Sequence, residues 1–178
     1  MYFERIRDLV EKGYQALILL PEIALTNQFS RRYKEFFGVE PAIWHSGTTK
    51  KNKSIIWKGI TENKTKIVIG ARSALFLPFK NLGVIVVDEE HDASYKQDEG
   101  VSYNARDMAV IRASLENIPI NLVTSIPSIE TYNNIINKKY HITKLEKRYK
   151  EASLPNIEII NLNSETLKKD SFYARATE

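Results

Sequence analysis

The apolar run Leu82–Val87 constrains the fold of this chain more than any other feature of its sequence. The run is rich in β-branched residues and does not alternate with polar ones, which is typical of a strand buried on both faces of a parallel sheet. Four polar residues follow it, from Asp88 to His91. Because ligands of open α/β sheets bind beyond the carboxyl ends of the strands, the sequence predicts an acidic site at the end of this strand.

Other apolar runs alternate with segments of helical spacing, and this alternation predicts βαβ units. The other predicted strands are Gln15–Leu20, Ala42–Trp44, Lys66–Ile69 and Ile118–Val123. The predicted helices run from Met1 to a stop at Gly13, from Thr26 to a stop at Gly38, from a cap at Asn104 to Leu115, and from Ser128 to about Asn137. We therefore expect a three-layer α/β sandwich with a mainly parallel sheet.

The C-terminal part of the sequence is less regular. Strand-like stretches occur at Tyr140–Leu145 and Asn156–Leu162, and the tail from Asn163 is polar. We expect a first domain over residues 1–150, and a strand with a polar linker over residues 151–178.

The amino-acid composition limits the classes of protein to which this chain can belong. The chain has 178 residues, with 43% hydrophobic and 27% charged content, as in ordinary globular proteins. It has no cysteine, which excludes both a disulfide framework and a thiolate zinc site. No apolar run approaches the roughly 18 residues of a membrane span, so we expect a cytoplasmic protein without a membrane partner. A net charge of +4 favours an acidic partner only weakly.

The polar residues after the central strand suit a particular chemistry. Asp88 is placed to hold a hydrated Mg²⁺, and Glu89 to polarise a water molecule. The alternative interpretation is that Asp88 to His91 only open a surface loop, since acidic loop starts are common.

Two further segments are candidates for binding phosphate groups. Gly70 follows a predicted strand and lets the backbone approach a phosphate closely, while Arg72 and Ser73 can bind one. Thr26 begins a predicted helix, where a hydroxyl and helix amides make good phosphate donors. For Thr26 an equally plausible role is that of a simple helix cap.

The segment Asp92–Tyr103 shows no periodicity and is predicted to be a loop long enough to have a function. Tyr95 and Tyr103, with Lys96 and Arg106, are the kinds of residue that stack on bases and neutralise a nucleic acid backbone. The alternative is that the two tyrosines pack the loop onto the domain.

Asp88-Glu89-Glu90-His91 resembles the second motif of superfamily 2 helicases in its Asp-Glu-x-His form. The longer segment Leu82–Gln97 resembles the bacterial primosomal replication-restart helicases. Four other segments resemble the same helicases: Pro21–Thr26, His45–Gly47, Gly70–Phe76 and Ala105–Asp107. All five segments stand in the order in which the family has them.

The resemblance implies a RecA-like lobe of an ATP-dependent, 3′-to-5′ DNA helicase that restarts stalled forks and loads the primosome. The implied cofactors are ATP and Mg²⁺, with zinc bound by cysteines outside this chain. The implied partners are forked and single-stranded DNA, primosome proteins and single-strand-binding proteins. In this family His91 would couple the catalytic acids to Pro127-Ser128 in the third motif. Ile126 stands where the family has a hydroxyl residue, which weakens the expected coupling.

The sequence contains no Gly-x-x-x-x-Gly-Lys-Ser/Thr loop, which P-loop ATPases use to hold the phosphates. We therefore expect a part of the first motor lobe that lacks its N-terminal strand and is inactive as an ATPase alone. In a RecA-like sheet this loss would leave Ile118–Val123 with an unpaired apolar edge. Whether the chain is an enzyme thus stays open. The alternatives are a non-enzymatic DNA- or primosome-binding module, an inert remnant of a split gene, and a non-helicase nucleotidase.

Overall fold

The computed structural model describes residues 2–24, 27–98 and 100–145. The chain divides into two units, Met1–Tyr140 and His141–Glu178, and every helix and strand named below belongs to the first. In the second unit, residues 141–145 are described and have no regular secondary structure. The expected boundary after residue 150 lies outside the described residues and stays a prediction.

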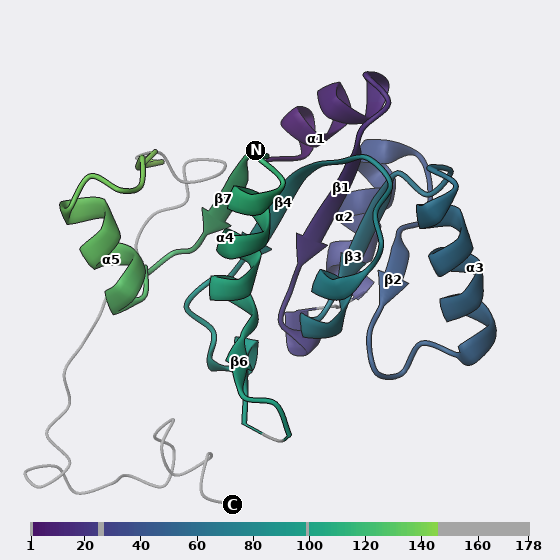
Figure 1. Ribbon diagram of the computed structural model, residues 1–178. Helices are drawn as coiled ribbons and strands as arrows, with labels where there is room; N and C mark the ends of the chain where they lie inside the picture. Colours follow the sequence, from purple (N-terminus) through teal and green to yellow (C-terminus); the bar gives the residue numbers. More distant parts are fainter. Residues whose placement is uncertain (1, 25–26, 99, 146–178) are drawn as a thin grey trace, which may run out of the picture. The chain divides into compact units, whose positions relative to one another are not determined.

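A parallel sheet forms the centre of the first unit (Figure 1). Its strands in spatial order are β2 (Ala42–Trp44), β3 (Ile67–Gly70), β1 (Gln15–Leu19), β4 (Leu82–Asp88) and β7 (Ile120–Val123). All four neighbouring pairs are parallel. The carboxyl ends of the strands therefore lie along one edge of the sheet, as the sequence predicted.

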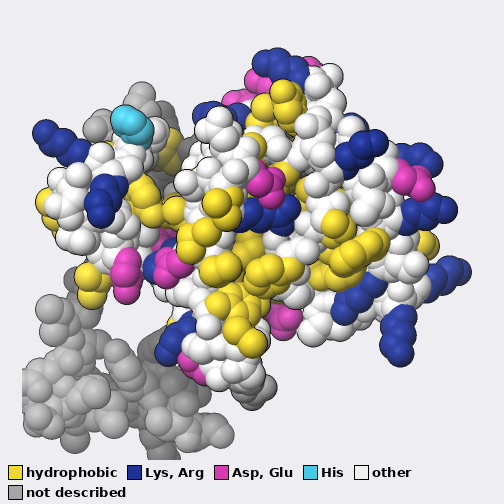
Figure 2. All heavy atoms as spheres, viewed as in Figure 1, with side chains coloured by type: hydrophobic (Ala, Val, Ile, Leu, Met, Phe, Trp, Pro, Cys, Tyr) yellow, Lys and Arg dark blue, Asp and Glu magenta, His cyan; other side chains and the backbone are white. Residues whose placement is uncertain are grey.

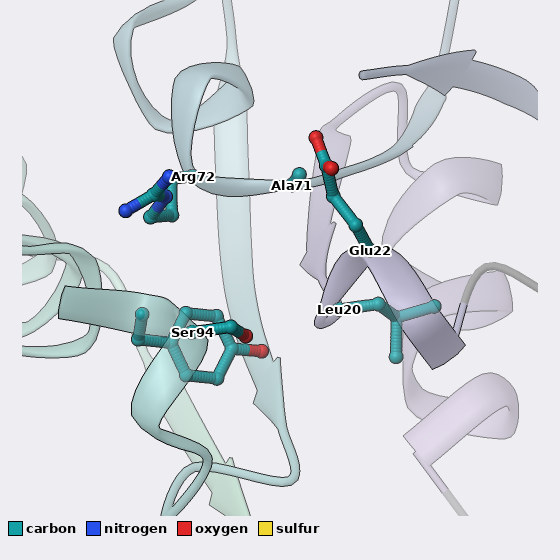
Figure 3. Close-up of a pocket in the computed structure, with 6 residues that line it drawn as sticks. Leu20, Glu22, Ala71, Arg72 and Ser94 are labelled. Atoms are coloured by element: carbon teal, nitrogen blue, oxygen red, sulfur yellow. The ribbon is translucent and has the colours of Figure 1, made fainter. Parts of the chain in front are cut away.

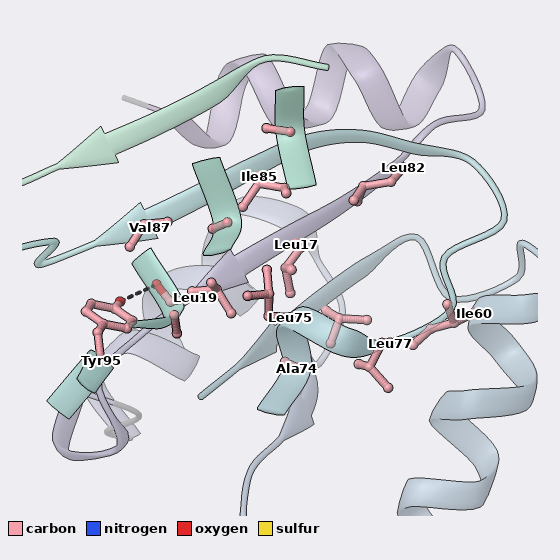
Figure 4. Packing of buried hydrophobic residues seen from close by; sticks show 14 of the residues in the cluster. Leu17, Leu19, Ile60, Ala74, Leu75, Leu77, Leu82, Ile85, Val87 and Tyr95 are labelled. Atoms are coloured by element: carbon pink, nitrogen blue, oxygen red, sulfur yellow. Dashed lines mark hydrogen bonds between the residues drawn. The ribbon is translucent and has the colours of Figure 1, made fainter. Parts of the chain in front are cut away.

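Helices cover both faces of this sheet and complete the predicted three layers. On one face α1 (Tyr2–Glu11) and α2 (Asn27–Phe37) pack against a cluster that includes Ile18 and Val86. On the other face α3 (Lys50–Thr61), the 3-10 helix η2 (Arg72–Phe76) and α4 (Ala105–Leu115) pack against a second cluster (Figure 4). Leu17 and Val87 are fully buried in that second cluster. Central strands with no exposed face explain the unbroken apolar runs of the sequence.

Local signals account for most helix ends. Asn104 caps α4 by accepting a hydrogen bond from the backbone N–H of Arg106 at 3.0 Å, and Ser128 caps α5 (Ile129–Ile136). Gly13 and Gly38, which follow α1 and α2, have φ values of 90° and 73°. Glycine adopts this left-handed region readily, so both predicted stops are confirmed.

The predicted loop Asp92–Tyr103 has more structure than expected. It begins with a 3-10 turn, η3 (Ala93–Tyr95), and continues as an antiparallel hairpin of β5 (Lys96–Gln97) and β6 (Tyr103–Asn104). Asp92 caps the turn by accepting a hydrogen bond from Ser94 N at 2.7 Å. Hydrogen bonds from the Ser94 side chain and then from its backbone N–H hold the pKa of Asp92 below its usual value.

The prediction of a strand at Tyr140–Leu145 is wrong. Its apolar residues have a strand-like spacing, but a strand also needs a neighbouring backbone, and residues 141–145 join no ladder. Ile142 and Leu145 are instead 52% and 62% exposed. The predicted strand Asn156–Leu162 and the tail from Asn163 lie outside the described residues.

Strand β7 forms one edge of the sheet. Within the described residues it pairs with β4 alone, and its four residues are half-buried. It begins two residues later than predicted, because Asn117, with a φ of 52°, and Pro119 belong to the turn after α4. Among the described helices none has the length and apolar character needed to cross a membrane.

Candidate functional site

Asp88, the last residue of β4, is held by two donors at the carboxyl edge of the sheet. The Tyr2 hydroxyl donates to Asp88 Oδ2 at 2.7 Å, and the Glu89 backbone N–H donates to Oδ1 at 3.1 Å. Burial, together with the charge of Asp88, raises the pKa of Tyr2, so the phenol stays a neutral donor. Asp88 thus has a fixed orientation, while each of its oxygens keeps a further lone pair for a bound water molecule.

Glu89 has an unusual backbone conformation that turns the chain away from the strand. Its φ is 50°, which non-glycine residues rarely adopt, and Asp92 N donates to Glu89 O at 2.8 Å to close the turn. The side chain is 48% exposed, and its Oε2 lies 3.7 Å from His91 Nδ1. Its carboxylate is therefore open to water, as the role predicted for it requires.

Glu90 is the centre of a buried polar network that the sequence did not reveal. This residue is 1% exposed, and its carboxylate accepts hydrogen bonds from Ser128 N at 2.8 Å, Ser128 Oγ at 2.9 Å and Thr131 Oγ1 at 2.9 Å. Arg106 Nη1 lies 3.3 Å from Glu90 Oε2 and completes an ion pair. The network joins the end of β4 to the starts of α4 and α5.

Arg106 does not point into solvent, as a residue that binds a DNA backbone would. It is 6% exposed, and its guanidinium donates to Asp107 at 2.8 Å and to Ser128 Oγ at 2.7 Å. Burial opposes its charge, but the carboxylates of Asp107 and Glu90 raise the pKa of Arg106. The predicted DNA contact of Arg106 is therefore wrong in this structure: the residue links structural elements.

His91 contacts a different part of the third motif from the one expected. Its Nδ1 lies 2.7 Å from Thr124 Oγ1, whereas Ser128, which follows Pro127, is bound by Glu90. The Thr124 hydroxyl also donates to Ile126 O at 2.8 Å and accepts from Ile126 N at 3.2 Å. The segment Asp88–His91 thus contacts the third motif at two points, through Glu90 at Ser128 and through His91 at Thr124.

Tyr95 packs the hairpin onto the domain, which is the alternative that the sequence left open. The side chain is 1% exposed, and its hydroxyl lies 3.0 Å from Leu19 O (Figure 4). The same hydroxyl lies 2.6 Å from Asp88 O. A buried ring cannot stack on a base, so the predicted stacking role of Tyr95 is wrong. The residue instead ties the base of the hairpin to the ends of β1 and β4.

The other predicted DNA contacts lie on the surface at the same edge of the sheet. Arg72 Nη1 donates to Lys96 O at 2.6 Å, and Ser73 is exposed. Arg72 also lines a pocket of about 80 Å³ with Leu20, Glu22, Ala71, Ser94 and Tyr95 (Figure 3). Lys96 is exposed but pairs with Asp98 at 3.1 Å, and Tyr103 is half-buried. Thr26 lies outside the described residues, so its role stays a prediction.

Gly70 is required by the packing at the end of β3, and its predicted approach to a phosphate stays a prediction. A Cβ built on it would meet Ala74 Cβ at 2.4 Å and the Trp44 carbonyl oxygen at 2.6 Å. The missing side chain lets η2 fold back against the end of β3, which places Arg72 and Ser73 at the edge of the sheet.

The acidic residues fit a magnesium ion held mostly by water. Among the described residues no group of three or more His, Asp or Glu side chains could enclose a metal. Mg²⁺ keeps several waters and often takes only one or two carboxylates, which Asp88 can provide. The fit to the triphosphate of ATP is poor, because the sequence has no phosphate-binding glycine loop. With no cysteine it also offers no thiolate to zinc.

Sequence comparison defines the class of protein to which this fold and site belong. Residues 1–135 match the sequence model of the DEAD/DEAH box helicases, and the chain belongs to that family.

Individual relatives are more specific. The chain is 53% identical over 175 residues to replication restart protein PriA of Rickettsia conorii, covering 98% of this chain and 27% of that protein. It is 36% identical over 165 residues to replication restart protein PriA of Bacillus subtilis, covering 93% and 20%. The chain thus spans about a quarter of the length of these curated relatives. The predicted resemblance to the replication-restart helicases is confirmed.

Solved structures include a similar one described as RecG bound to a three-way DNA junction. The two sequences are 22% identical, and the superposition has a TM-score of 0.46. It covers 68% of this chain and 15% of the RecG chain. The predicted RecA-like helicase fold is confirmed by the parallel sheet together with the family match.

Proposed function

We propose that this chain forms part of the motor of an ATP-dependent DNA helicase that moves 3′ to 5′ and restarts stalled replication forks. The observation that carries the proposal is the position of Asp88 and Glu89 at the carboxyl end of β4 in a chain of the DEAD/DEAH box family. The 53% identity to a replication restart protein supports the restart role.

The chemistry assigned to the acidic edge rests on its geometry. Asp88, oriented by Tyr2, would hold Mg²⁺ through water, and the ion would offset the charge of the phosphates. Glu89, exposed beside His91, orients and activates the attacking water. Because this chain lacks a phosphate-binding loop, we assign it only this side of the ATP site and expect no hydrolysis by the chain alone.

The proposed substrate is forked and single-stranded DNA. Arg72 and Ser73 would bind its phosphates, and the hairpin that carries Lys96 and Tyr103 lies beside them. Tyr95 joins this hairpin to the Asp88 carbonyl, so DNA binding and the acidic site share one element. Primosome proteins, single-strand-binding proteins and a cytoplasmic location belong to the proposal through the resemblance alone.

The DNA role can be tested by fluorescence anisotropy with labelled forked and single-stranded oligonucleotides over a range of salt concentrations. We expect weak binding that falls steeply with salt, because phosphate contacts release counterions. Arg72→Glu should weaken it. Lys64→Glu is the matched control. Lys64 precedes β3 and therefore lies at the amino ends of the strands, away from the carboxyl ends where Arg72 lies.

Equal binding by the wild type and Arg72→Glu would remove the DNA role of η2. The same titration separates the alternatives. An inert remnant would bind no DNA, whereas a non-enzymatic module would bind DNA and remain unable to support hydrolysis when built into a longer relative.

A further inference from the structure

A groove lies between the edge strand β2 and helix α3, away from Asp88 and Glu89. Its volume is about 360 Å³, which falls within the range of roughly 300–1,000 Å³ that is usual for ligand pockets. The strands β3 and β1 separate β2 from β4, so the proposed motor site does not account for this groove. The residues that line it are Pro41, Ala42 and Ile43 on one side, and Asn52, Ile55 and Ile56 on the other.

Apolar side chains dominate the lining, and one of them is exposed to solvent. Ile55 is 60% exposed, whereas the next residue, Ile56, is 9% exposed and belongs to the core. The core is therefore closed without Ile55, and an isoleucine in this position stays in water at a cost in free energy. Exposed apolar surface with a polar rim is typical of a site for another protein.

Helix α3 makes the rim of the groove basic. Its 12 residues include four lysines and no acidic residue. Lys51 lies four residues before Ile55 and Lys58 three residues after it, so both lysines are on the face of α3 that carries Ile55. Figure 2 shows that Lys and Arg side chains predominate on the surface in the region where Figure 1 places α3.

These charges have little compensation from nearby acids. Within the described part of the chain Lys51 is in no ion pair, and Lys58 reaches Glu62 only at 3.9 Å. Glu40 precedes Pro41 at the opposite wall, but it is already paired with Lys34 at 2.5 Å. The rim can therefore accept a negatively charged ligand.

The backbone of β2 is poorly suited to pair with a further strand, which limits how a ligand can bind. Pro41 has no N–H, and the carbonyl of Ile43 already accepts a hydrogen bond from the Thr48 hydroxyl at 3.1 Å. A ligand of the groove is therefore held by its side chains. Aliphatic walls suit an apolar side chain of a protein, whereas single-stranded nucleic acids bind where aromatic rings stack on their bases.

We propose that the groove between β2 and α3 is a docking site for an acidic segment of a partner protein. A large apolar side chain of that segment inserts beside Ile55 and Ile56, and its carboxylates lie near Lys51 and Lys58. Charge complementarity selects this partner, because the lysines attract an acidic segment and repel a basic one. The inference does not depend on the proposed motor chemistry, since it uses none of the same residues.

The test measures the fluorescence anisotropy of labelled synthetic peptides titrated with the full chain. One set of peptides carries a central leucine, phenylalanine or tryptophan between aspartates. A second set has alanine at the centre, and a third has lysines in place of the aspartates. We expect binding only by the acidic peptides that keep the large apolar residue.

Two substitutions separate the apolar contact from the charges. Ile55→Glu should weaken binding by about tenfold or more, because it places a negative charge in the apolar lining at the centre of the contact. Lys51→Glu should weaken binding several-fold and reduce its dependence on salt.

Each substitution has a matched control. Ile111→Glu makes the same change as Ile55→Glu at a residue of α4 that is 50% exposed and does not line the groove. Lys50→Glu matches Lys51→Glu, since Lys50 is five residues before Ile55 and so lies on another face of α3. Neither control should change peptide binding, and thermal melts check that every variant is folded.

Every outcome bears on the docking site. Failure of the wild type to bind any of the acidic peptides overturns it, as does an equal loss of binding in Ile55→Glu and Ile111→Glu. Equal binding of the aspartate and lysine peptides overturns the acidic partner. If oligothymidine displaces the peptide and itself binds Ile55→Glu less well, the groove binds nucleic acid and the proposal is wrong.

The same titration keeps this inference apart from the proposed DNA role. Arg72→Glu should leave peptide binding unchanged, because Arg72 belongs to η2 and does not line the groove. Loss of DNA binding in Arg72→Glu with intact peptide binding would support both. Loss of peptide binding in Arg72→Glu would overturn the docking site.

Discussion

The buried carboxylate of Glu90 has a larger structural role than the two acidic residues that precede it. It accepts three hydrogen bonds from the start of α5 and pairs with Arg106, yet it lies next to the exposed Glu89 in the sequence. Groups in such a network depend on one another, because each donor removed leaves a buried charge without a partner. Glu90 and Glu89 therefore make a matched pair for the same substitution.

Glu90→Gln should lower the free energy of unfolding by about 3 kcal/mol, since breaking a buried ion pair typically costs that much. Glu89→Gln should change it by no more than about 0.5 kcal/mol, as is usual for exposed positions. Both values can be measured by urea denaturation. A Glu90→Gln protein as stable as Glu89→Gln would show that the network contributes nothing to the fold.

A double-mutant cycle with Thr131→Val adds a second measurement. Because Thr131 donates to the same carboxylate at 2.9 Å, its effect should be coupled to that of Glu90→Gln by about 1 kcal/mol or more. Strictly additive effects would contradict a shared network.

The sequence predicted the acidic pair at this site better than the partners that position it. Asp88 and Glu89 could be found because they directly follow an apolar run, which is a local pattern. Glu90 and Arg106 meet only after folding, and nothing in the spacing of an acid and a distant arginine shows that both are buried. The contact of Tyr2 with Asp88 could not be predicted either, because the sequence indicates only that Tyr2 belongs to a helix.

At the scale of elements, the turn from β3 into η2 depends on one glycine. The position that a Gly70 Cβ would occupy is already filled by Ala74 and by the Trp44 carbonyl, which belongs to β2. Backbone cannot move aside as a flexible side chain can, so three elements would have to separate.

Gly70→Ala should therefore destabilise the chain by about 2 kcal/mol or more, as overpacking of a tight site does. Gly38→Ala is a useful contrast. Nothing lies within 4 Å of its added Cβ, and its φ of 73° makes the cost one of backbone strain, about 1 kcal/mol. Thermal melts of the two variants measure both effects. A Gly70→Ala protein that melts with the wild type would mean that η2 does not pack as described.

Elements with strong local signals were predicted well, and those that depend on pairing were not. The β-branched strands and the helices that end at Gly13 or Gly38 needed no information from elsewhere in the chain. The short β5 and β6 strands carry no periodic pattern, because a ladder of two residues is set by its partner. Tyr140–Leu145 failed for the opposite reason: it has the pattern of a strand but no partner in the described residues.

At the scale of the whole molecule, the edge of the sheet at β7 is open within the described residues. The opposite edge is short, since β2 has three residues and follows Pro41, and both features discourage pairing with another chain. Near β7, helix α5 exposes Ile129 at 85% and Ile136 at 61%. An unpaired edge with exposed apolar side chains nearby favours association.

We expect residues 1–178 to self-associate, with an apparent mass that rises with concentration. Sedimentation velocity over a wide concentration range measures this directly. A monodisperse monomer that melts cooperatively at every concentration would contradict the expectation, and would show that the β7 edge is protected in some other way.

Catalysis is the sharpest test at this scale, because it needs more than the acidic edge. Asp88 and Glu89 can hold a hydrated metal and orient water, but positioning and charge stabilisation of the phosphates account for nearly all of phosphoryl-transfer catalysis. Loss of one well-placed donor typically lowers the rate on the order of a hundredfold, and this chain has no phosphate-binding loop. We therefore expect residues 1–178 to release no phosphate above background on forked DNA.

A chimera separates the contribution of these residues from what they lack. In it, this chain replaces the matching 175-residue segment of Rickettsia conorii PriA, and the rest of that protein is retained. We expect DNA-stimulated phosphate release from the chimera. Glu89→Gln should abolish the release while sparing nucleotide binding, because the glutamine cannot activate water, and Glu11→Gln, at the exposed end of α1, should have no effect. Phosphate release by residues 1–178 alone that is lost in Glu89→Gln would show that the chain already holds a complete site.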